Sequence, residues 1–143
     1  MLKRLCENYE IMSWDSYVDN IISRSNENCD RACLIGRDGS VWTTGHEKAI
    51  KLSADEIQKL VHCYNSGDFD TLKSNGVFVE GQKYQFLRCE DNVILAKMRG
   101  CGALTIECSS RGIIIGHTKE GCHQGNVNTA VAAIASYLKS IDY

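Results

Sequence analysis

Five aromatic residues near the ends of the sequence carry the clearest chemical signal. Trp14 and Tyr17 are one helical turn apart, so their rings share one edge of a predicted helix. Tyr137 falls in the last predicted helix, Tyr143 is the final residue, and Trp42 follows a predicted turn. If the terminal helices pack side by side, the five rings gather at one end of the domain. They would form either ordinary core or an aromatic-lined groove for a polyproline II ligand, whose carbonyls accept bonds from Trp N–H and Tyr O–H.

Motifs that would support catalysis are absent from the sequence. It has no G-x-x-x-x-G-K-[ST] phosphate loop, no G-x-S-x-G nucleophile elbow and no H-E-x-x-H helix. A Cys/His nucleophile and base pair is conceivable, for example Cys122 with His117 or His123. Adjacent residues on an extended loop point apart, however, so His123 is poorly placed to take a proton from Cys122. We expect no enzymatic activity, and a cysteine hydrolase is an alternative that thiol alkylation would test.

Eight cysteines raise the question of disulfides or zinc. The first ten residues include Glu7 and Glu10 and lack the apolar core of a signal peptide, which favours a reducing compartment and buried free thiols. Structural zinc sites need closely paired ligands in two sets, and the sequence has no Cys-x-x-Cys pair. We therefore expect free thiols, no metal and no cofactor.

Length and composition indicate one globular domain. The 143 residues suffice for a single core, and 43% of them are hydrophobic and 24% charged. There is no run of 18 apolar residues, so no membrane-spanning segment is expected. A net charge of −2 gives no general attraction to nucleic acid, and we expect no nucleic-acid partner.

Three hydrophobic stripes with helical spacing predict the elements that position the aromatic residues. The helices run from Trp14 to Ile22 after a Ser13 cap, from Ile57 to Tyr64 after a Ser53 capping box, and from Val127 to Ile141 after an Asn126 cap. β-rich runs lie between them at 32–36, 41–44, 76–79, 83–89, 93–98, 103–108 and 112–117, and short turns separate most of these. We predict an α+β fold, an α/β sandwich. Its central antiparallel sheet has about seven strands, the N- and C-terminal helices pack together on one face, and a further helix lies elsewhere.

Four blocks of sequence, in order, resemble the profilins, which bind actin monomers. The blocks are Met12-Ser13-Trp14-Asp15-Ser16-Tyr17-Val18-Asp19, Gly81-Gln82-Lys83-Tyr84, Lys119-Glu120-Gly121-Cys122-His123-Gln124-Gly125-Asn126, and Ala135-Ser136-Tyr137-Leu138 with Tyr143. We therefore predict a profilin domain at 12–143. Residues 1–11 are interpreted as an N-terminal extension, either flexible or arising from an upstream start.

The resemblance implies a cytoplasmic, cytoskeletal protein with two protein partners. It would bind monomeric actin one to one, speed exchange of the actin nucleotide, block addition at pointed ends and dock proline-rich proteins such as formins. Holding both partners raises the local monomer concentration at a growing filament end. The resemblance also implies binding of polyphosphoinositide head groups, which needs clustered Lys and Arg.

The resemblance assigns roles to individual positions. The proline groove matches the five aromatic residues named first: Trp14, Tyr17, Trp42, Tyr137 and Tyr143. Tyr137 stands where many animal relatives carry histidine. The matching actin-binding positions lie on the later strands and the start of the last helix: Lys83, Arg88, Lys97, Arg99, Cys122, His123, Gly125 and Asn128. The phosphoinositide candidates are Lys83, Arg88, Lys97 and Arg99, with Arg111 as a further one.

One other fold class fits the predicted elements. PAS-like and roadblock-like sensor or scaffold domains also wrap helices around an antiparallel sheet. Such a domain would have an internal ligand cavity or a dimer interface. It would not need Trp14, Tyr17 and Tyr143 to be exposed together.

Overall fold

The computed structural model describes residues 13–143, so the predicted extension at 1–11 lies outside the described residues. The elements follow in the order α2 (Ser16–Arg24), β1 (Cys29–Gly36), α3 (Ala54–Ser66), α4 (Asp70–Asn75), β2 (Val77–Val79), β3 (Gln82–Glu90), β4 (Val93–Met98), β5 (Gly102–Cys108), β6 (Gly112–Thr118) and α5 (Gln124–Ser140). The strands form an antiparallel sheet in the order β1-β6-β5-β4-β3-β2. Consecutive strands from β2 to β6 are therefore neighbours, and β1 closes the far edge.

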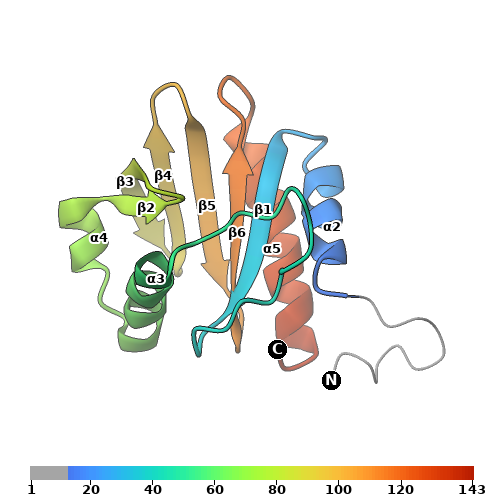
Figure 1. Cartoon of the computed structure of the whole chain (residues 1–143), viewed down its shortest axis with the longest axis horizontal. Helices are drawn as coiled ribbons and strands as arrows, with labels where there is room; N and C mark the ends of the chain where they lie inside the picture. The colour runs from blue at the N-terminus through green and yellow to red at the C-terminus, as the bar shows by residue number, and fades with distance from the viewer. Residues whose placement is uncertain (1–12) are drawn as a thin grey trace.

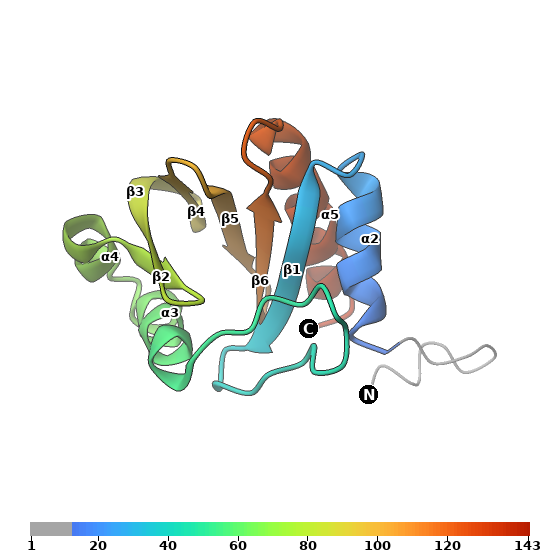
Figure 2. The same cartoon turned by 45° about the horizontal axis from the view of Figure 1, so that its top comes forward.

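Alternate residues of the inner strands face two separate cores. On β6, Ile113 and Ile115 belong to the core beneath α3, whereas Ile114 belongs to the core beneath α2 and α5. Figures 1 and 2 show the same division, with α2 and α5 side by side on one face of the sheet and α3 on the other. Because both faces are covered, β6 is a continuous apolar run rather than an alternating one.

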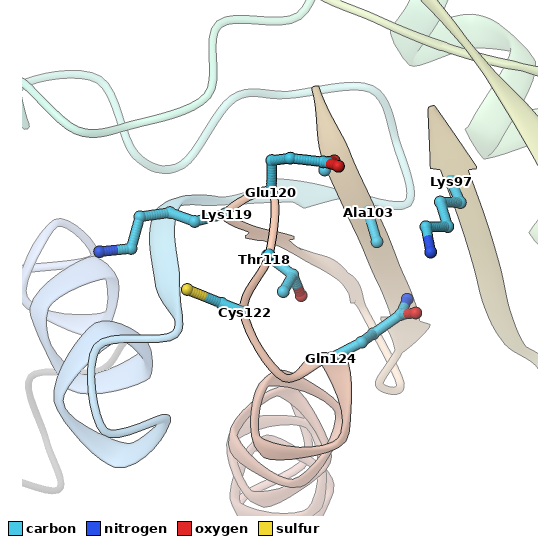
Figure 3. A pocket seen from close by; sticks show the side chains of 9 residues that line it. Lys97, Ala103, Thr118, Lys119, Glu120, Cys122 and Gln124 are labelled. Atoms are coloured by element: carbon cyan, nitrogen blue, oxygen red, sulfur yellow. The ribbon is translucent and has the colours of Figure 1, made fainter. Parts of the chain in front are cut away.

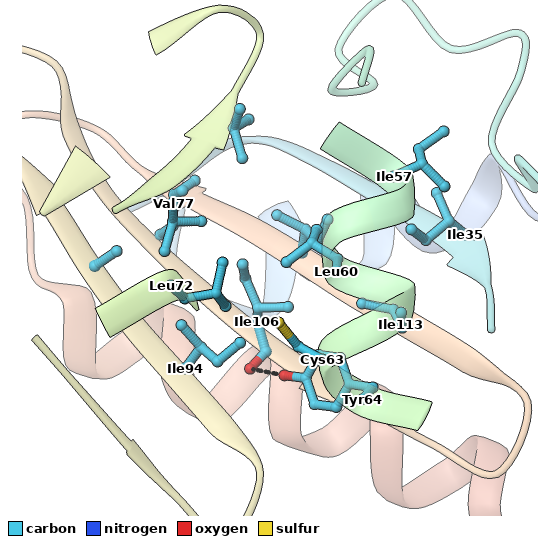
Figure 4. Close-up of a cluster of buried hydrophobic side chains, with 14 of the residues drawn as sticks. Ile35, Ile57, Leu60, Cys63, Tyr64, Leu72, Val77, Ile94, Ile106 and Ile113 are labelled. Atoms are coloured by element: carbon cyan, nitrogen blue, oxygen red, sulfur yellow. Dashed lines mark hydrogen bonds between the residues drawn. The ribbon is translucent and has the colours of Figure 1, made fainter. Parts of the chain in front are cut away.

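The core beneath α3 is anchored by a buried tyrosine (Figure 4). The hydroxyl of Tyr64 lies 2.8 Å from the carbonyl oxygen of Asn92 and 3.1 Å from that of Ile106. Burial raises the pKa of Tyr64 well above its ordinary value, so the phenol stays protonated and can donate. Its ring also meets Phe69 edge-on, with 5.3 Å between the centroids. The end of α3 is thereby fixed to the centre of the sheet.

The predicted capping box at the start of α3 is confirmed, and its glutamate has a wider role. The Ser53 hydroxyl accepts from the N–H of Glu56, while the Glu56 carboxylate accepts from the N–H of Ser53. The same carboxylate accepts from the N–H groups of Glu80 and Gly81, at 3.0 and 2.8 Å. Glu56 is buried, so one carboxylate joins α3 to the turn between β2 and β3.

The other two predicted caps are wrong. Helix α2 begins at Ser16, and the carbonyl of Ser13 accepts from the Ser16 N–H and hydroxyl instead of capping the helix through its side chain. Helix α5 begins at Gln124, so Asn126 lies inside its first turn. His123 precedes this helix and makes no side-chain capping bond. The six-residue α4 was not predicted, because it is too short to show a helical stripe.

The predicted fold class is confirmed, with six strands in place of about seven. Residues 41–44, predicted as a strand, supply only an isolated antiparallel bridge between Val41 and Ile35. The main chain of Trp42 donates to the carbonyl of Leu34, but the N–H of Leu34 donates to the side-chain oxygen of Thr43. A side chain thus replaces the main-chain acceptor that a ladder would need, and the pairing stops.

The seven cysteines among residues 13–143 are free thiols. Burial raises the pKa of Cys29 to about 11 and that of Cys33 to about 12, so both remain protonated at neutral pH and act as small apolar side chains. Within the same residues, no group of His, Cys, Asp and Glu side chains is placed to hold a metal ion. No helix in this part of the chain has the length and apolar character needed to cross a membrane.

Candidate functional site

Trp14 is the centre of an aromatic cluster at one end of the domain. Its ring centroid lies 5.5 Å from that of Tyr17, 4.2 Å from that of Trp42 and 5.6 Å from that of Tyr143. The rings of Trp42 and Tyr143 meet edge-on, 6.1 Å apart. Four of the five predicted aromatic residues therefore touch, although they come from both ends of the sequence.

Tyr137 lies beyond Tyr17 and not within the cluster itself. The two tyrosines line one hollow of about 190 Å³ between α2 and α5, together with Asn20, Arg24, Ala133 and Ile134. Tyr137 is 45% exposed, whereas Tyr17 is only 3% exposed. Tyr17 is therefore almost fully buried, because it packs against α5 in the core beneath α2 and α5. Its ring supports the floor, and Tyr137 offers the accessible face.

A second hollow, of about 430 Å³, lies at the other end of the cluster. Trp42 and Tyr143 line it with Arg37, Asp38, Ser110 and Arg111. We call the row of rings from Tyr137 through Tyr17 and Trp14 to Tyr143 and Trp42 the aromatic track. The track has a hollow at each end, and Trp14 joins the two halves.

Tethers that the sequence analysis missed hold α2 against the segment after β1. The Asp15 carboxylate accepts from the N–H of Gly45 at 3.0 Å. One turn later, Asp19 lies 2.8 Å from Nε2 of His46, whose Nδ1 accepts from the N–H of Lys48. These contacts fix the segment that carries Trp42 relative to Trp14. The sequence feature that could have indicated these tethers is the pair Asp15 and Asp19, one helical turn apart beside Trp14 and Tyr17.

Trp42 and Tyr143 are held in place by contacts with residues of neighbouring turns and strands. The indole N–H of Trp42 donates to the Ser40 hydroxyl at 3.1 Å. Its ring lies over Gly112, where an added Cβ would come within 2.8 Å of the indole, so this position needs glycine for close approach. The carbonyl of Tyr143 accepts from the main chain of Arg111 and, at 2.7 Å, from the Ser109 hydroxyl.

The predicted actin-binding cations lie on β3, β4 and the turn after β4. Lys83, Arg88 and Lys97 are exposed on these strands, and Arg99 is exposed in the turn. The register pairs Gln85 with Lys97 and Arg88 with Leu95, two positions earlier on β4, so Arg88 and Lys97 lie on the same face of neighbouring strands without being directly opposite. Arg88 also lies 3.7 Å from Glu90, which offsets part of its charge.

The remaining predicted actin-binding residues lie in the loop before α5 and in its first two turns. Asn28 holds this loop, because its side chain accepts from the N–H of His123 at 3.0 Å and its carbonyl accepts from the N–H of Lys119. His123 and Gly125 are exposed, and Asn128 accepts from the Thr105 hydroxyl. Both ends of the loop are thus bonded to Asn28, the residue before β1.

A polar hollow of about 250 Å³ joins the two groups of residues. Figure 3 shows the side chains of Lys97, Thr118 and Gln124 directed into it, whereas the sulfur of Cys122 points to the other side of the loop. Lys97 and Cys122 are the only predicted actin-binding residues that line this hollow within the described chain. Lys83, Arg88 and Arg99 lie outside it, on the neighbouring strand and turn.

The hydroxyl of Thr118 is buried in the wall of this hollow and has no hydrogen-bond partner among the described residues. Replacing Thr118 with valine removes that hydroxyl and keeps the shape. We expect the free energy of unfolding to rise by about 1 kcal/mol, because an unpaired buried hydroxyl costs about that much. Urea unfolding measures it, with Thr105→Val as the control. Thr105 donates to Asn128, so its loss should be destabilising. A less stable Thr118→Val protein would show that the hydroxyl has a partner.

The hydrogen bonds of His117 decide whether this residue could serve as the base of a cysteine hydrolase using Cys122. Nδ1 of His117 lies 2.6 Å from the Asp30 carboxylate, and Nε2 lies 2.7 Å from the carbonyl oxygen of Cys101. Both ring nitrogens are therefore occupied by other residues, and neither is available to take a proton from Cys122. His117 joins β6 to the start of β1 and to the turn between β4 and β5.

Comparisons with known proteins agree on one family. A family model described as profilin matches residues 12–143. A profilin of Strongylocentrotus purpuratus is 47% identical over 140 residues, covering 91% of this chain and 99% of that protein. The structure of Schizosaccharomyces pombe profilin is similar with a TM-score of 0.79 at 29% identity, over 92% of this chain and all of that one. Mouse profilin IIa in complex with a double repeat from the FH1 domain of mDia1 has a TM-score of 0.75 at 21% identity, with the same coverage.

Proposed function

This chain belongs to the profilin family, an actin-binding family without enzymatic activity, and from that membership we propose that it links two partners. The aromatic track binds proline-rich segments of other proteins, such as those of formins. The exposed face formed by β3, β4 and the start of α5 binds monomeric actin. This assignment takes residues 12–143 as the functional domain.

The observation that carries the proposal is the contact of the Trp14 ring with those of Tyr17, Trp42 and Tyr143. A polyproline II helix advances about 3.1 Å per residue and has no main-chain N–H to bury, so flat rings can pack against its pyrrolidine rings at little entropic cost. The ring centroids of Trp42 and Tyr143 lie 4.2 and 5.6 Å from that of Trp14, so these partly exposed rings can meet prolines about one or two positions apart. The mouse relative with this fold is itself bound to a double repeat from the FH1 domain of mDia1, which supports the same use of the track here.

On the actin face, exposed cations are suited to acidic protein surfaces, and Gly125 allows close approach of another main chain. Binding one conformation of actin better than another would speed nucleotide exchange without any chemistry by this chain. Polyphosphoinositide head groups are proposed to use the same cations, because all of them are exposed: Lys83, Arg88, Lys97 and Arg99. The two ligands should therefore compete. Free thiols within residues 13–143 suit the cytoplasm, where we place both activities.

One experiment tests both halves of the proposal. The chain is passed over immobilised poly-L-proline in the presence of ATP-loaded actin monomers, and bound protein is eluted with free poly-L-proline. The proposal predicts that the chain is retained and carries actin with it. Failure of the chain to bind the matrix contradicts the role of the track. Retention of the chain without actin contradicts the role of the second face.

Replacing Gly125 with glutamine tests the actin face alone. An added Cβ at Gly125 meets nothing within 4 Å, and glutamine favours helix more than glycine does, so the variant should fold. The added side chain fills the space through which actin would approach, and we expect actin affinity to fall on the order of tenfold with binding of poly-L-proline retained.

Fluorescence anisotropy with labelled actin monomers gives the affinity of the Gly125→Gln protein. The matched control is Ala54→Gln, an exposed position in the first turn of α3 on the opposite face. Equal actin affinity of the two variants would place the actin contact elsewhere on the molecule.

A further inference from the structure

The hollow at the Trp42 end of the aromatic track contains charges that a run of prolines cannot use. Two arginines and one aspartate line it beside Trp42 and Tyr143, in a volume of about 430 Å³. A polyproline segment has neutral side chains, so a guanidinium can donate to its carbonyls but finds no opposite charge on it. Which of the three charges is free to act on a ligand depends on what each already contacts.

Arg37 is held by the protein itself. Its guanidinium lies 3.0 Å from the carbonyl of Tyr64, 3.2 Å from the carbonyl of Ser109 and 3.2 Å from the side-chain oxygen of Asn65. All three nitrogens of the group thus donate to neighbouring atoms. Arg37 fixes the end of α3 against the turn between β5 and β6, and these bonds leave neither edge of its fork with two free nitrogens for a carboxylate.

Asp38 is likewise occupied. Its carboxylate accepts from the N–H of Ser40 at 3.0 Å and from the Ser40 hydroxyl at 2.6 Å. These bonds lower the pKa of Asp38, so the side chain is ionised at neutral pH. Its partner is therefore Ser40. The remaining charged side chain that lines the hollow is that of Arg111.

Arg111 differs from both, because its main chain is held in place while its guanidinium forms no ion pair. Its N–H donates to the carbonyl of Tyr143, and its own carbonyl accepts from the N–H of Arg37 at 2.7 Å, so its main chain is fixed on both sides. The guanidinium lies over the Tyr143 ring, 5.1 Å from the centroid. It is exposed, and no acid among residues 13–143 forms an ion pair with it.

We propose that Arg111 selects proline-rich ligands that carry an aspartate or glutamate directly beside the proline stretch. Stacking on Tyr143 orients the guanidinium and leaves its N–H edge free to bind a carboxylate through two parallel hydrogen bonds. A carboxylate on the residue after the last ring contact would reach this edge, because each polyproline residue advances only about 3.1 Å. The proposal rests on the proposed function of the track and adds a preference among its ligands.

The test is a set of calorimetric titrations at low salt with four peptides that share one proline stretch. One peptide has no flanking charge, one has Glu-Glu before the prolines, one has Glu-Glu after them, and one has Lys-Lys at both ends. We expect one of the two acidic peptides to bind about three- to tenfold more tightly than the uncharged peptide, and the lysine peptide to bind less tightly than it. In Arg111→Gln, the ratio of acidic to uncharged affinity should fall to about one.

Lys73→Gln is the matched control, because it removes an exposed cation from α4, away from the track. Its ratio of acidic to uncharged affinity should equal that of the unmodified chain. Arg24→Gln tests the hollow at the Tyr137 end of the track. Loss of the preference in Arg24→Gln instead of Arg111→Gln overturns the proposal, and so does equal affinity for all four peptides when the uncharged one binds. If the uncharged peptide does not bind the unmodified chain at all, the role of the track fails, and the selection by Arg111 fails with it.

Discussion

Poly-L-proline should bind the Trp14→Ala protein at least about thirtyfold more weakly than the unmodified chain, since a central aromatic anchor typically contributes about 2 kcal/mol or more. Trp14 is the only residue whose ring meets three others of the track among the described residues. Its removal separates the hollow beside Tyr137 from the hollow beside Trp42. Isothermal titration calorimetry with a fixed-length poly-L-proline peptide gives the loss directly.

Phe78→Ala is the matched control for removing a half-buried aromatic ring. Phe78 lies on β2, away from the track, and the ammonium of Lys59 lies 5.5 Å from its ring centroid. This variant should bind poly-L-proline like the unmodified chain. Far-UV circular dichroism checks that both variants are folded. A folded Trp14→Ala protein that binds as tightly as Phe78→Ala would return Trp14 to a purely structural role.

Replacing Glu56 with alanine should lower the free energy of unfolding by about 3 kcal/mol or more. The Glu56 carboxylate is buried and accepts from the N–H groups of Ser53, Glu80 and Gly81. Without it, the capping box is lost and donors in two separate segments lose their acceptor. Equilibrium urea unfolding measures the change. Glu56→Gln should lie between the two proteins, since its remaining carbonyl oxygen can still accept.

Asp55→Ala removes an exposed carboxylate from the same helix, so it separates the effect of burying a carboxylate from the effect of losing its charge. Asp55 is the preceding residue, and its carboxylate forms an exposed pair with Lys59 at 3.1 Å in the same helix. Such pairs contribute about 0.5 kcal/mol or less. If Glu56→Ala costs no more than Asp55→Ala, Glu56 does not hold α3 to the hairpin in solution.

Features decided by neighbours in sequence were predictable. The start of α3 follows from Ser53 and Glu56 three positions apart, and the stripe from Val127 to Ile141 predicts a helix whose apolar side faces the sheet. The same periodicity placed Trp14 and Tyr17 on one helix edge, which is why the aromatic residues could be grouped before the fold was known. The resemblance to profilins, confirmed by the comparisons, gave the family.

Features decided by distant contacts were not predictable. Residues 41–44 have the composition of a strand, but the Thr43 side chain occupies the N–H of Leu34 and ends the ladder. The tether from Asp15 to Gly45 spans thirty positions and has no periodic signature. Burial of Tyr17 depends on how closely α5 approaches α2, which no local pattern reports. The hollow with Arg111 forms only when the end of the chain returns to the turn after β5.

The most direct test of the aromatic track is intrinsic tryptophan fluorescence during titration with poly-L-proline. Trp14 and Trp42 are the only tryptophans in the sequence and both belong to the track, so the emission reports on that surface alone. The track should give a saturable change in intensity and wavelength that is absent in Trp14→Ala, where Trp42 still emits. A flat titration in the folded chain, or the same saturable change in Trp14→Ala, would contradict a proline site between the terminal helices.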